Sequence, residues 1–331
     1  MPLDYKRSLR RAVWGRKLSW KEALFLTNDD GIEAPGLHRL IKELHGLGHP
    51  LAVLAPATEQ SASGMRLSLQ SELEFRERKD IIEFLELDEE GPPVYIYSLA
   101  GTPCDCAIVG INHGFENWAP LIRPQMCVSG INRGPNISID VLHSGTISAA
   151  REAALYGLPA VAVSLGTYHH QDYSTGMVAI LELIRRALAV TKSPPPNLMR
   201  PRGSKQCPWS VNQMAMENRV REAFRNGDII LNVNAPEKWD GVVETVPLGA
   251  RWYHGATHSS DSKAGFIVGA ASIEDEPIPN TDCTGLIEGH VVISPLATWP
   301  QSHPLSVPDM LLKSATFGGV DGYPEWLIEN P

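Results

Sequence analysis

The sequence has no apolar stretch that approaches the length of a membrane-spanning helix, so we expect no membrane association. It also has no excess of positive charge, since 29 Lys and Arg stand against 38 Asp and Glu, a formal net charge of -9. That balance argues against a general binder of nucleic-acid polymers or membrane surfaces. A small phosphorylated substrate is still compatible with it, because a bound cation reverses the local sign of charge inside one site.

Cysteine is scarce, with five residues in the chain, and the number is odd. No secretory signal precedes them, so we expect a reducing compartment, the cytoplasm. Cys104 and Cys106 have the wrong spacing for a zinc site and lack a second cysteine pair, so we interpret the cysteines as buried thiols. The first 21 residues leave organelle targeting open, because seven Lys and Arg against one acid also match a transit peptide.

Short apolar runs alternate with amphipathic stretches from Ala23 to about residue 190. The helical spacing begins after Pro35 and recurs in two later segments. This alternation predicts a Rossmann-like, doubly wound α/β fold with a mostly parallel sheet. The expected strands lie near residues 23–27, 51–54, 81–87, 94–99, 126–128 and 161–165, and the expected helices near 37–47, 147–156 and 177–188.

The second half of the chain has a different pattern. Five prolines fall between residues 191 and 210, which predicts an exposed insertion, followed by a helix at 212–225. Strands return at 229–233 and 290–294, and the region beyond Pro236 is strand-rich with long polar loops. We therefore divide the chain into a basic N-terminal extension (1–22), a catalytic core (23–190), a Pro-rich insertion (191–227), and a last core strand with a C-terminal extension (228–331).

Two adjacent carboxylates, Asp29 and Asp30, directly follow the first expected strand. The carboxyl edge of an open α/β sheet is where such folds bind ligands. Neighbouring carboxylates repel unless a cation or a proton lies between them, and no Lys or Arg occurs between Leu24 and Leu37. A hard cation with oxygen ligands explains the pair. The alternative is that one Asp caps the following helix while the other faces water.

Three further segments follow strands or begin helices at the same edge: residues 59–64, 129–136 and 144–146. The last of them, Ser144, Gly145 and Thr146, precedes an Ala-rich stretch. Small residues with free N–H groups at a helix N-terminus can hold a phosphate, although the same pattern also forms an ordinary helix cap. Because all four segments converge on one edge of the predicted sheet, we favour a phosphate and metal site there.

Five sequence blocks occur in order along the chain: TNDDG at 27–31 with APG at 34–36, AP at 55–56 with SASG at 61–64, GTP at 101–103 with DC at 105–106, SGIN at 129–132 with GPN at 134–136, and SGT at 144–146. Together they resemble the SurE (survival protein E) family of metal-dependent phosphatases, 5'/3'-nucleotidases and acid phosphatases that act on nucleoside monophosphates. The resemblance covers about Ala23 to Leu188 and returns more thinly beyond Ile230. The Pro-rich insertion departs from the compact bacterial pattern and is similar to that of plant-like members.

The resemblance implies two sets of site residues. Its metal ligands fall on Asp29, Asp30, Ser61 and Asn132. Its phosphate-binding residues fall on Asn136, Ser144, Gly145 and Thr146. Carboxylate, hydroxyl and amide oxygens suit Mg²⁺ or Mn²⁺. Ser63 competes for the role of Ser61, and Asn28, beside the carboxylates, is a weaker candidate for binding the phosphate.

The expected reaction is hydrolysis of a phosphomonoester by a metal-activated water, with Asp29 and Asp30 as the catalytic residues. One alternative is a covalent aspartyl-phosphate route through Asp29, although haloacid-dehalogenase-like enzymes separate their two aspartates by one residue. Another is a nucleotide or phosphate sensor without turnover. The resemblance also implies a homodimer or homotetramer joined through the C-terminal extension. We interpret His254 and His258 as loop or strand-end histidines rather than as a metal pair.

Overall fold

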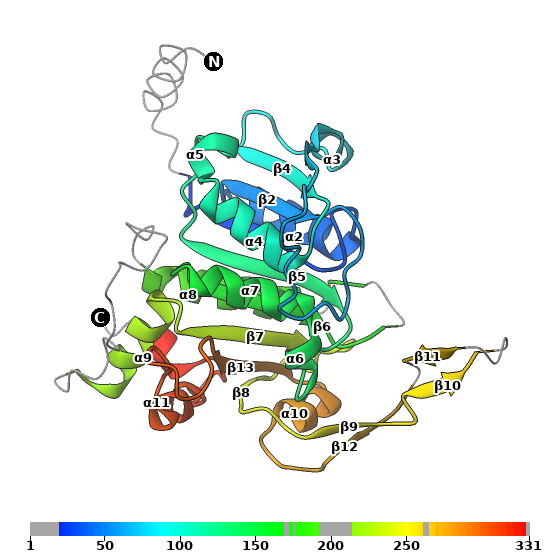
Figure 1. The fold of residues 1–331 in the computed structure, drawn as a ribbon. Helices are drawn as coiled ribbons and strands as arrows, with labels where there is room; N and C mark the ends of the chain where they lie inside the picture. Colours follow the sequence, from blue (N-terminus) through cyan, green and yellow to red (C-terminus); the bar gives the residue numbers. More distant parts are fainter. Residues whose placement is uncertain are drawn as a thin grey trace.

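The computed structural model describes residues 20–168, 172–174, 176–191, 214–260, 265–269 and 271–328. Within these residues, nine strands form one sheet in the order β3-β4-β2-β1-β5-β6-β7-β13-β8 (Figure 1). Their bounds are β1 Leu24–Thr27, β2 Leu51–Pro56, β3 Phe75–Glu77, β4 Val94–Leu99, β5 Met126–Arg133, β6 Ala160–Leu165, β7 Ile229–Ala235, β8 Val243–Thr245 and β13 Val291–Ala297.

The sheet is mostly parallel, as predicted. Only the β3–β4 and β7–β13 pairs are antiparallel among its strands. The chain enters at the centre with β1, builds outward through β2 and β4, and then crosses to the other side of β1 with β5, β6 and β7. The strand order therefore reverses between β1 and β5, and such a switch point is where doubly wound sheets bind ligands.

Helices cover both faces of the sheet, because its central strands are buried on both sides. One face carries α2 Pro35–Gly46, α8 Met177–Thr191, α9 Met216–Arg225 and α11 Asp309–Ala315. The other face carries α4 Pro103–Asn112, α5 Phe115–Trp118 and α7 Gly145–Leu155. This arrangement confirms the doubly wound fold.

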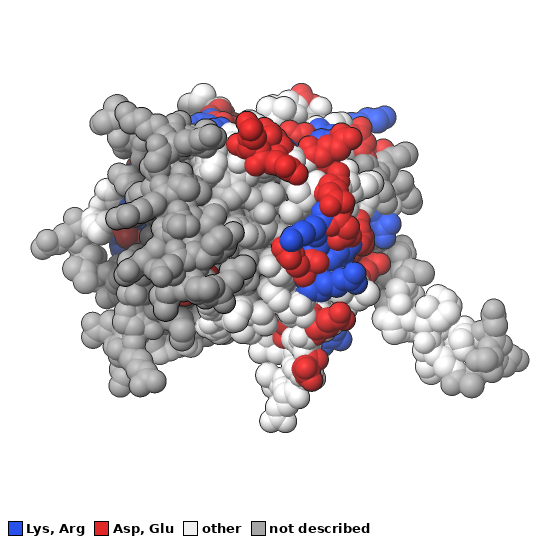
Figure 2. Space-filling view, turned by 90° about the horizontal axis from the view of Figure 1, so that it is seen from above, with Lys and Arg blue, Asp and Glu red and all other residues white. Residues whose placement is uncertain are grey.

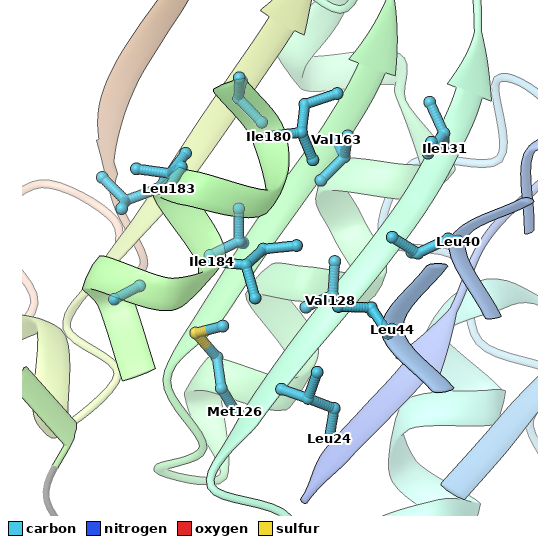
Figure 3. Close-up of a cluster of buried hydrophobic side chains, with 14 of the residues drawn as sticks. Leu24, Leu40, Leu44, Met126, Val128, Ile131, Val163, Ile180, Leu183 and Ile184 are labelled. Atoms are coloured by element: carbon cyan, nitrogen blue, oxygen red, sulfur yellow. The ribbon is translucent and has the colours of Figure 1, made fainter. Parts of the chain in front are cut away.

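The close-up in Figure 3 shows how the first of these faces is packed. Leu40 and Leu44 of α2 and Ile184 of α8 lie over Leu24 and Val128 of the central strands. Leu40 and Leu44 are four residues apart, so they lie on the same side of α2. Fully burying one such aliphatic side chain is worth about 1.5–3 kcal/mol. This packing holds β1 and β5 rigidly at the centre of the sheet.

The strand that we predicted at residues 81–87 is wrong. Lys79–Phe84 form a short helix, α3, and the sheet edge is occupied instead by β3. Ile81 and Leu85 are buried at helical spacing, whereas Phe84 is 74% exposed. The apolar residues thus follow a period of four, not two. Only one side of this segment is buried, which is typical of a helix on the surface rather than of a strand inside the sheet.

Helix α4 was not predicted, although the sequence carries its signal. Thr102 accepts a hydrogen bond from the Asp105 backbone N–H, and the Asp105 side chain accepts one from the Thr102 backbone N–H. This reciprocal capping box is followed by Pro103 at the first helical position. The small, apolar residues of α4 gave little amphipathic contrast, which is why periodicity alone missed it.

The C-terminal part is strand-rich, as predicted. Beyond β8, an arm leaves the body of the molecule at the lower right of Figure 1. It consists of two antiparallel pairs: β9 Arg251–His254 with β12 Ser272–Asp275, and β10 Thr257–Ser259 with β11 Phe266–Val268. His254 and His258 lie in β9 and β10, in agreement with their interpretation as strand residues. Helix α10, Asp282–Glu288, follows the arm.

Several predictions concern residues outside the described part of the chain. They include residues 1–19 of the N-terminal extension, residues 192–213 of the insertion, and Cys207. The helix expected at 212–225 corresponds to α9, which begins at Met216. The four cysteines that the structure describes are buried free thiols, as expected. Among the described residues, none of the helices is long and apolar enough to cross a membrane. The four-part division of the chain stays a prediction.

Candidate functional site

The site lies at the switch point between β1 and β5. Asp29 and Asp30 directly follow β1, and Asn132 lies near the end of β5. The pairing of β5 with β6 shifts register between Ser129 and Asn132. Such an irregularity re-aims the side chains beyond it. The turn after β1 and the end of β5 are therefore brought to the same edge, as the sequence predicted.

The N-terminus of α7 contacts the first of these carboxylates. Ser144 is the N-cap, and its hydroxyl accepts a hydrogen bond from the Ile147 backbone N–H at 3.1 Å. The hydroxyl of Thr146 donates to the Asp29 carboxylate. Burial raises the pKa of Asp29, which is only 2% exposed, while hydrogen bonds from Thr146 and the Gly145 backbone oppose that rise. Asp29 thus lies where the helix dipole favours negative charge.

Asp30 is more exposed and is held by the other strand. Its carboxylate accepts the Arg133 backbone N–H at 3.0 Å. Burial and the neighbouring negative charge of Asp29 raise the pKa of Asp30 to about 6. Two adjacent carboxylates that both resist ionisation form a place where a cation would be stabilised.

Gly145 leaves room for this arrangement because it has no side chain. A Cβ at this position would lie 2.7 Å from the Asp29 Cβ and 2.7 Å from the Ser63 hydroxyl oxygen. The glycine is thus required by close approach of other groups. The Ser63 hydroxyl is buried and has no hydrogen-bond partner in the described structure. The sequence offered Ser63 only as a competitor of Ser61, whereas the structure places it against Gly145.

The loop after β2 is fastened to the site from both sides. The Gln60 backbone N–H donates to the Asp29 carbonyl oxygen at 2.7 Å, and the Gly64 N–H donates to the His143 carbonyl oxygen at 2.9 Å. Ser61 is exposed, and its hydroxyl donates to Glu59 at 2.9 Å. The loop therefore lies where the sequence predicted it, and the role of Ser61 as a metal ligand stays a prediction.

Two asparagines present oxygen atoms near the carboxylates. The amide nitrogen of Asn132 donates to the Gly134 carbonyl at 2.8 Å, so the amide oxygen is the atom that a cation would use. The amide nitrogen of Asn28 donates to the Gly31 carbonyl at 2.8 Å, and its buried oxygen has no partner among the described residues. A buried acceptor without a donor is costly, and a cation would satisfy it. These donors fit a hard cation with oxygen ligands.

Asn136 has a structural role that the sequence did not reveal. Its amide nitrogen donates to the Ser164 hydroxyl at 2.8 Å, and its backbone N–H donates to the Asn234 side chain at 2.7 Å. Asn232 in turn donates to its carbonyl oxygen. The loop after β5 is thereby tied to β6 and β7. The buried asparagines within an apolar strand were the signal for this network. A direct contact of Asn136 with phosphate stays a prediction.

The groups that could bind a cation at the switch point present oxygen atoms. No group of three or more His, Cys, Asp and Glu residues that could hold a metal occurs in the described part of the chain. A cation at the switch point would therefore depend on Asp29 and Asp30 together with neutral oxygens from hydroxyl and amide groups. Such a mixed site leaves ligand positions for water and phosphate.

The chain is similar to proteins of one family along most of its length. A family model described as Survival protein SurE matches residues 24–254. The 5'-nucleotidase SurE of Geobacter sp. (strain M21) is 33% identical over 282 residues, covering 82% of this chain and 92% of that protein. The 5'-nucleotidase SurE of Natranaerobius thermophilus is 30% identical over 280 residues, again covering 82% and 92%.

A crystal structure of the SurE protein from Aquifex aeolicus shares the fold, with a TM-score of 0.58 and 22% identity over 85% of this chain and 95% of that chain. The family match includes all of the loops that meet at the switch point. The site geometry and the sequence similarity therefore agree, and the chain belongs to the SurE family.

Proposed function

We propose that this protein is a metal-dependent phosphomonoesterase that hydrolyses nucleoside monophosphates, a 5'/3'-nucleotidase and acid phosphatase. The observation that carries the proposal is the contact of the α7 N-terminus with Asp29, beside Asp30. It puts a phosphate-favouring helix end next to a cation-favouring carboxylate pair. The curated relatives named 5'-nucleotidase SurE support the same substrate class.

The proposed ligands of the cation, Mg²⁺ or Mn²⁺, are Asp29, Asp30, Ser61 and Asn132. When bound, the ion would lower the pKa of a water molecule and neutralise charge on the phosphate. We assign the phosphate oxygens to Ser144, Gly145 and Thr146 at the start of α7, together with Ser63 and Asn136. Either aspartate could accept the proton of the attacking water. Phosphoryl transfer depends mainly on this positioning and charge stabilisation.

The covalent alternative is less compatible with the geometry. A nucleophilic Asp29 would have to approach phosphorus, but the residue is 2% exposed and its carboxylate accepts the Thr146 hydroxyl. The sensor alternative makes a different prediction, namely nucleotide binding without turnover. Measurements of turnover and of nucleotide binding distinguish the sensor from the phosphomonoesterase.

The test is release of inorganic phosphate from nucleoside monophosphates after EDTA treatment, with and without added Mg²⁺ or Mn²⁺. We expect turnover only when the metal is restored. The matched measurement is nucleotide binding by calorimetry under the same conditions. Binding without phosphate release under any divalent cation would favour the sensor and contradict the proposal.

We further propose that the protein is a homodimer or homotetramer joined through the arm. Among the described residues, β10 and β11 pair with each other and with no third strand, and Phe266 and Val268 are 78% and 79% exposed. An isolated two-stranded hairpin is marginally stable in water. The outer part of the arm is formed by the described residues 255–260 and 265–269. These residues include no Lys, Arg, Asp or Glu, as the lower right of Figure 2 shows. A second copy of the chain would cover this apolar surface.

A further inference from the structure

Arg251 joins the base of the arm to the body of the protein. It begins β9 and is 8% exposed. Its guanidinium donates twice to the Asp275 carboxylate on β12, at 2.7 and 2.8 Å, and once to Asp140 at 3.1 Å. Asp275 lies directly opposite Arg251 in the strand pair, so this first contact is internal to the arm. The contact with Asp140 leaves the arm.

Asp140 begins α6, Asp140–His143, the short helix that leads into α7. Its carboxylate also accepts the hydroxyl of Tyr253 from β9. Its carbonyl oxygen accepts the Ser144 backbone N–H at 2.9 Å. Asp140 is therefore bound on one side by two residues of the arm, and on the other side by the N-cap of α7.

Ser138 provides a second attachment of the same loop. Its hydroxyl accepts the Arg251 backbone N–H at 2.8 Å and donates to the Gly249 carbonyl at 2.9 Å. Its backbone N–H donates to the Asp282 carboxylate at 2.9 Å. The segment that precedes α7 is thus fixed by hydrogen bonds to both ends of the region that carries the arm.

The charges at this junction are buried and interdependent. Burial lowers the pKa of Arg251, but its hydrogen bonds to the Asp275 carboxylate and the charge of Asp140 outweigh that effect and raise the pKa. Removing one member of such a cluster leaves an uncompensated buried charge, which is relieved when the remaining group takes up a proton or moves. Because β9 is paired with β12 along its length, we expect any displacement in the segment that carries Asp140.

We propose that Arg251 is a positioning residue that, through Asp140, fixes the N-terminus of α7 at Asp29 and thereby sets the affinity of the site for phosphate. The path runs from Arg251 to Asp140, then to Ser144, and then through the first turn of α7 to Asp29. This inference rests on the proposed function, since it assigns α7 to phosphate binding. Arg251 itself is not a catalytic residue, because it contacts Asp140 and Asp275 rather than the carboxylate pair.

The test compares Arg251→Met, which keeps the apolar stem, with the wild type. We expect KM for a nucleoside monophosphate and Ki for inorganic phosphate to rise about 10- to 100-fold, because small misplacements of a binding group have effects of that size. The midpoint for Mg²⁺ or Mn²⁺ activation should change less than Ki for phosphate, since α7 contacts one proposed metal ligand, Asp29, and carries none of the four itself. Asp140→Asn should act in the same direction.

Arg186→Met is the matched control. Arg186 also forms two ion pairs through its guanidinium, with Glu182 and Asp321, but it lies on α8 outside the path. It should lose thermal stability without a change in Ki for phosphate. If Arg251→Met changes phosphate affinity no more than Arg186→Met does at similar loss of stability, the positioning role is refuted.

Tyr253→Phe covers the case in which Arg251→Met does not fold. It removes only the hydroxyl that reaches Asp140, and we expect Ki for phosphate to rise about two- to tenfold, the equivalent of one hydrogen bond. A wild-type Ki in a folded Tyr253→Phe variant would overturn the proposal.

Direct calorimetry with inorganic phosphate separates this inference from the proposed function. A wild-type protein that binds phosphate but hydrolyses no nucleotide would contradict the function, while the variants would still test the path from Arg251. A wild-type protein that binds no phosphate with metal present would overturn both.

Discussion

The carboxyl edge of the sheet and the arm differ in which kind of group they leave unsatisfied. At the edge, Asn28 is fully buried and Asp29 is 2% exposed, whereas in the arm Phe266 and Val268 are 78% and 79% exposed. Buried polar groups and exposed apolar patches are both departures from the usual distribution. Each indicates a region that is completed by something outside the chain. We propose a cation and an anion at the edge and an apolar surface of a second copy at the arm.

The largest effect is expected for Asp29→Asn and Asp30→Asn. Each should lower metal-dependent turnover by about 10²-fold or more, on the scale of losing one electrostatic group at a reacting centre. The metal-free protein should be equally or more stable, because the substitution removes one of two repelling charges. Phosphate release and thermal melting in EDTA check both parts. Wild-type turnover at saturating metal in either variant would show that the carboxylate pair is not the metal site.

Gly145→Ala should have the next largest effect, and that effect should fall on phosphate binding at the carboxyl edge. The added Cβ would lie 2.7 Å from two atoms, and overpacking of this kind costs about 1–3 kcal/mol, or roughly 5- to 150-fold in affinity. We expect a higher Ki for inorganic phosphate and a smaller change in the metal midpoint, since the added Cβ meets one of the four proposed metal ligands, Asp29. Gly46→Ala is the matched control, since a Cβ there meets nothing within 4 Å. Equal phosphate inhibition in both variants would show that α7 carries only a cap.

Ser61→Ala and Ser63→Ala should distinguish the cation site from the phosphate site at the carboxyl edge. We expect Ser61→Ala to weaken activation by Mg²⁺ or Mn²⁺, and Ser63→Ala to weaken phosphate binding, each by about two- to tenfold, the effect of one polar contact. The reason is that the Ser63 hydroxyl lies beside Gly145, whereas Ser61 is exposed. Metal titrations and phosphate inhibition distinguish them. A larger metal effect in Ser63→Ala would reverse the assignment.

Phe266→Asp tests the proposed interface at the arm. A charge on the exposed apolar surface of β11 should disfavour association, and light scattering should then show a mass closer to the 36.2 kDa of one chain. Val178→Asp is the control, because Val178 is 70% exposed on α8, away from the arm. A monomeric wild type at micromolar concentration would remove the proposed interface and leave the edge unaffected.

The smallest effect on turnover is expected for Glu152→Gln, which concerns a buried carboxyl of α7 beyond the site. Burial and the charge of Asp105 raise the pKa of Glu152 to about 7. A raised carboxyl pKa destabilises the fold as pH rises through it. The variant should therefore unfold like the wild type at pH 4.5 and be more stable by on the order of 1–3 kcal/mol at pH 8. Urea unfolding at both pH values measures this, and a variant that is less stable at pH 8 would contradict it.

Much of the edge could be predicted because it depends on neighbouring residues. The apolar run before Asp29 and the helical spacing after Pro35 predict a strand, a turn and a helix. Ser144 before an Ala-rich stretch predicts an N-cap, and its hydroxyl accepts the Ile147 N–H. The same rules could have found α4 through Thr102 and Asp105. They failed at 81–87, where apolar content was read as a strand although Ile81 and Leu85 follow helical spacing.

Only the tertiary structure decided which distant side chains meet. Arg251 and Asp140 are 111 positions apart, and Asn136 and Asn234 are 98 apart, so no local pattern relates them. Ser63 reaches Gly145 because β2 lies beside β1 while α7 packs across the face of the sheet. The sequence by itself determined most of the segments, though not α3 or α4, since hydrogen bonding and periodicity act within a few residues. The contacts between segments follow from strand order and helix packing, which depend on the whole core at once.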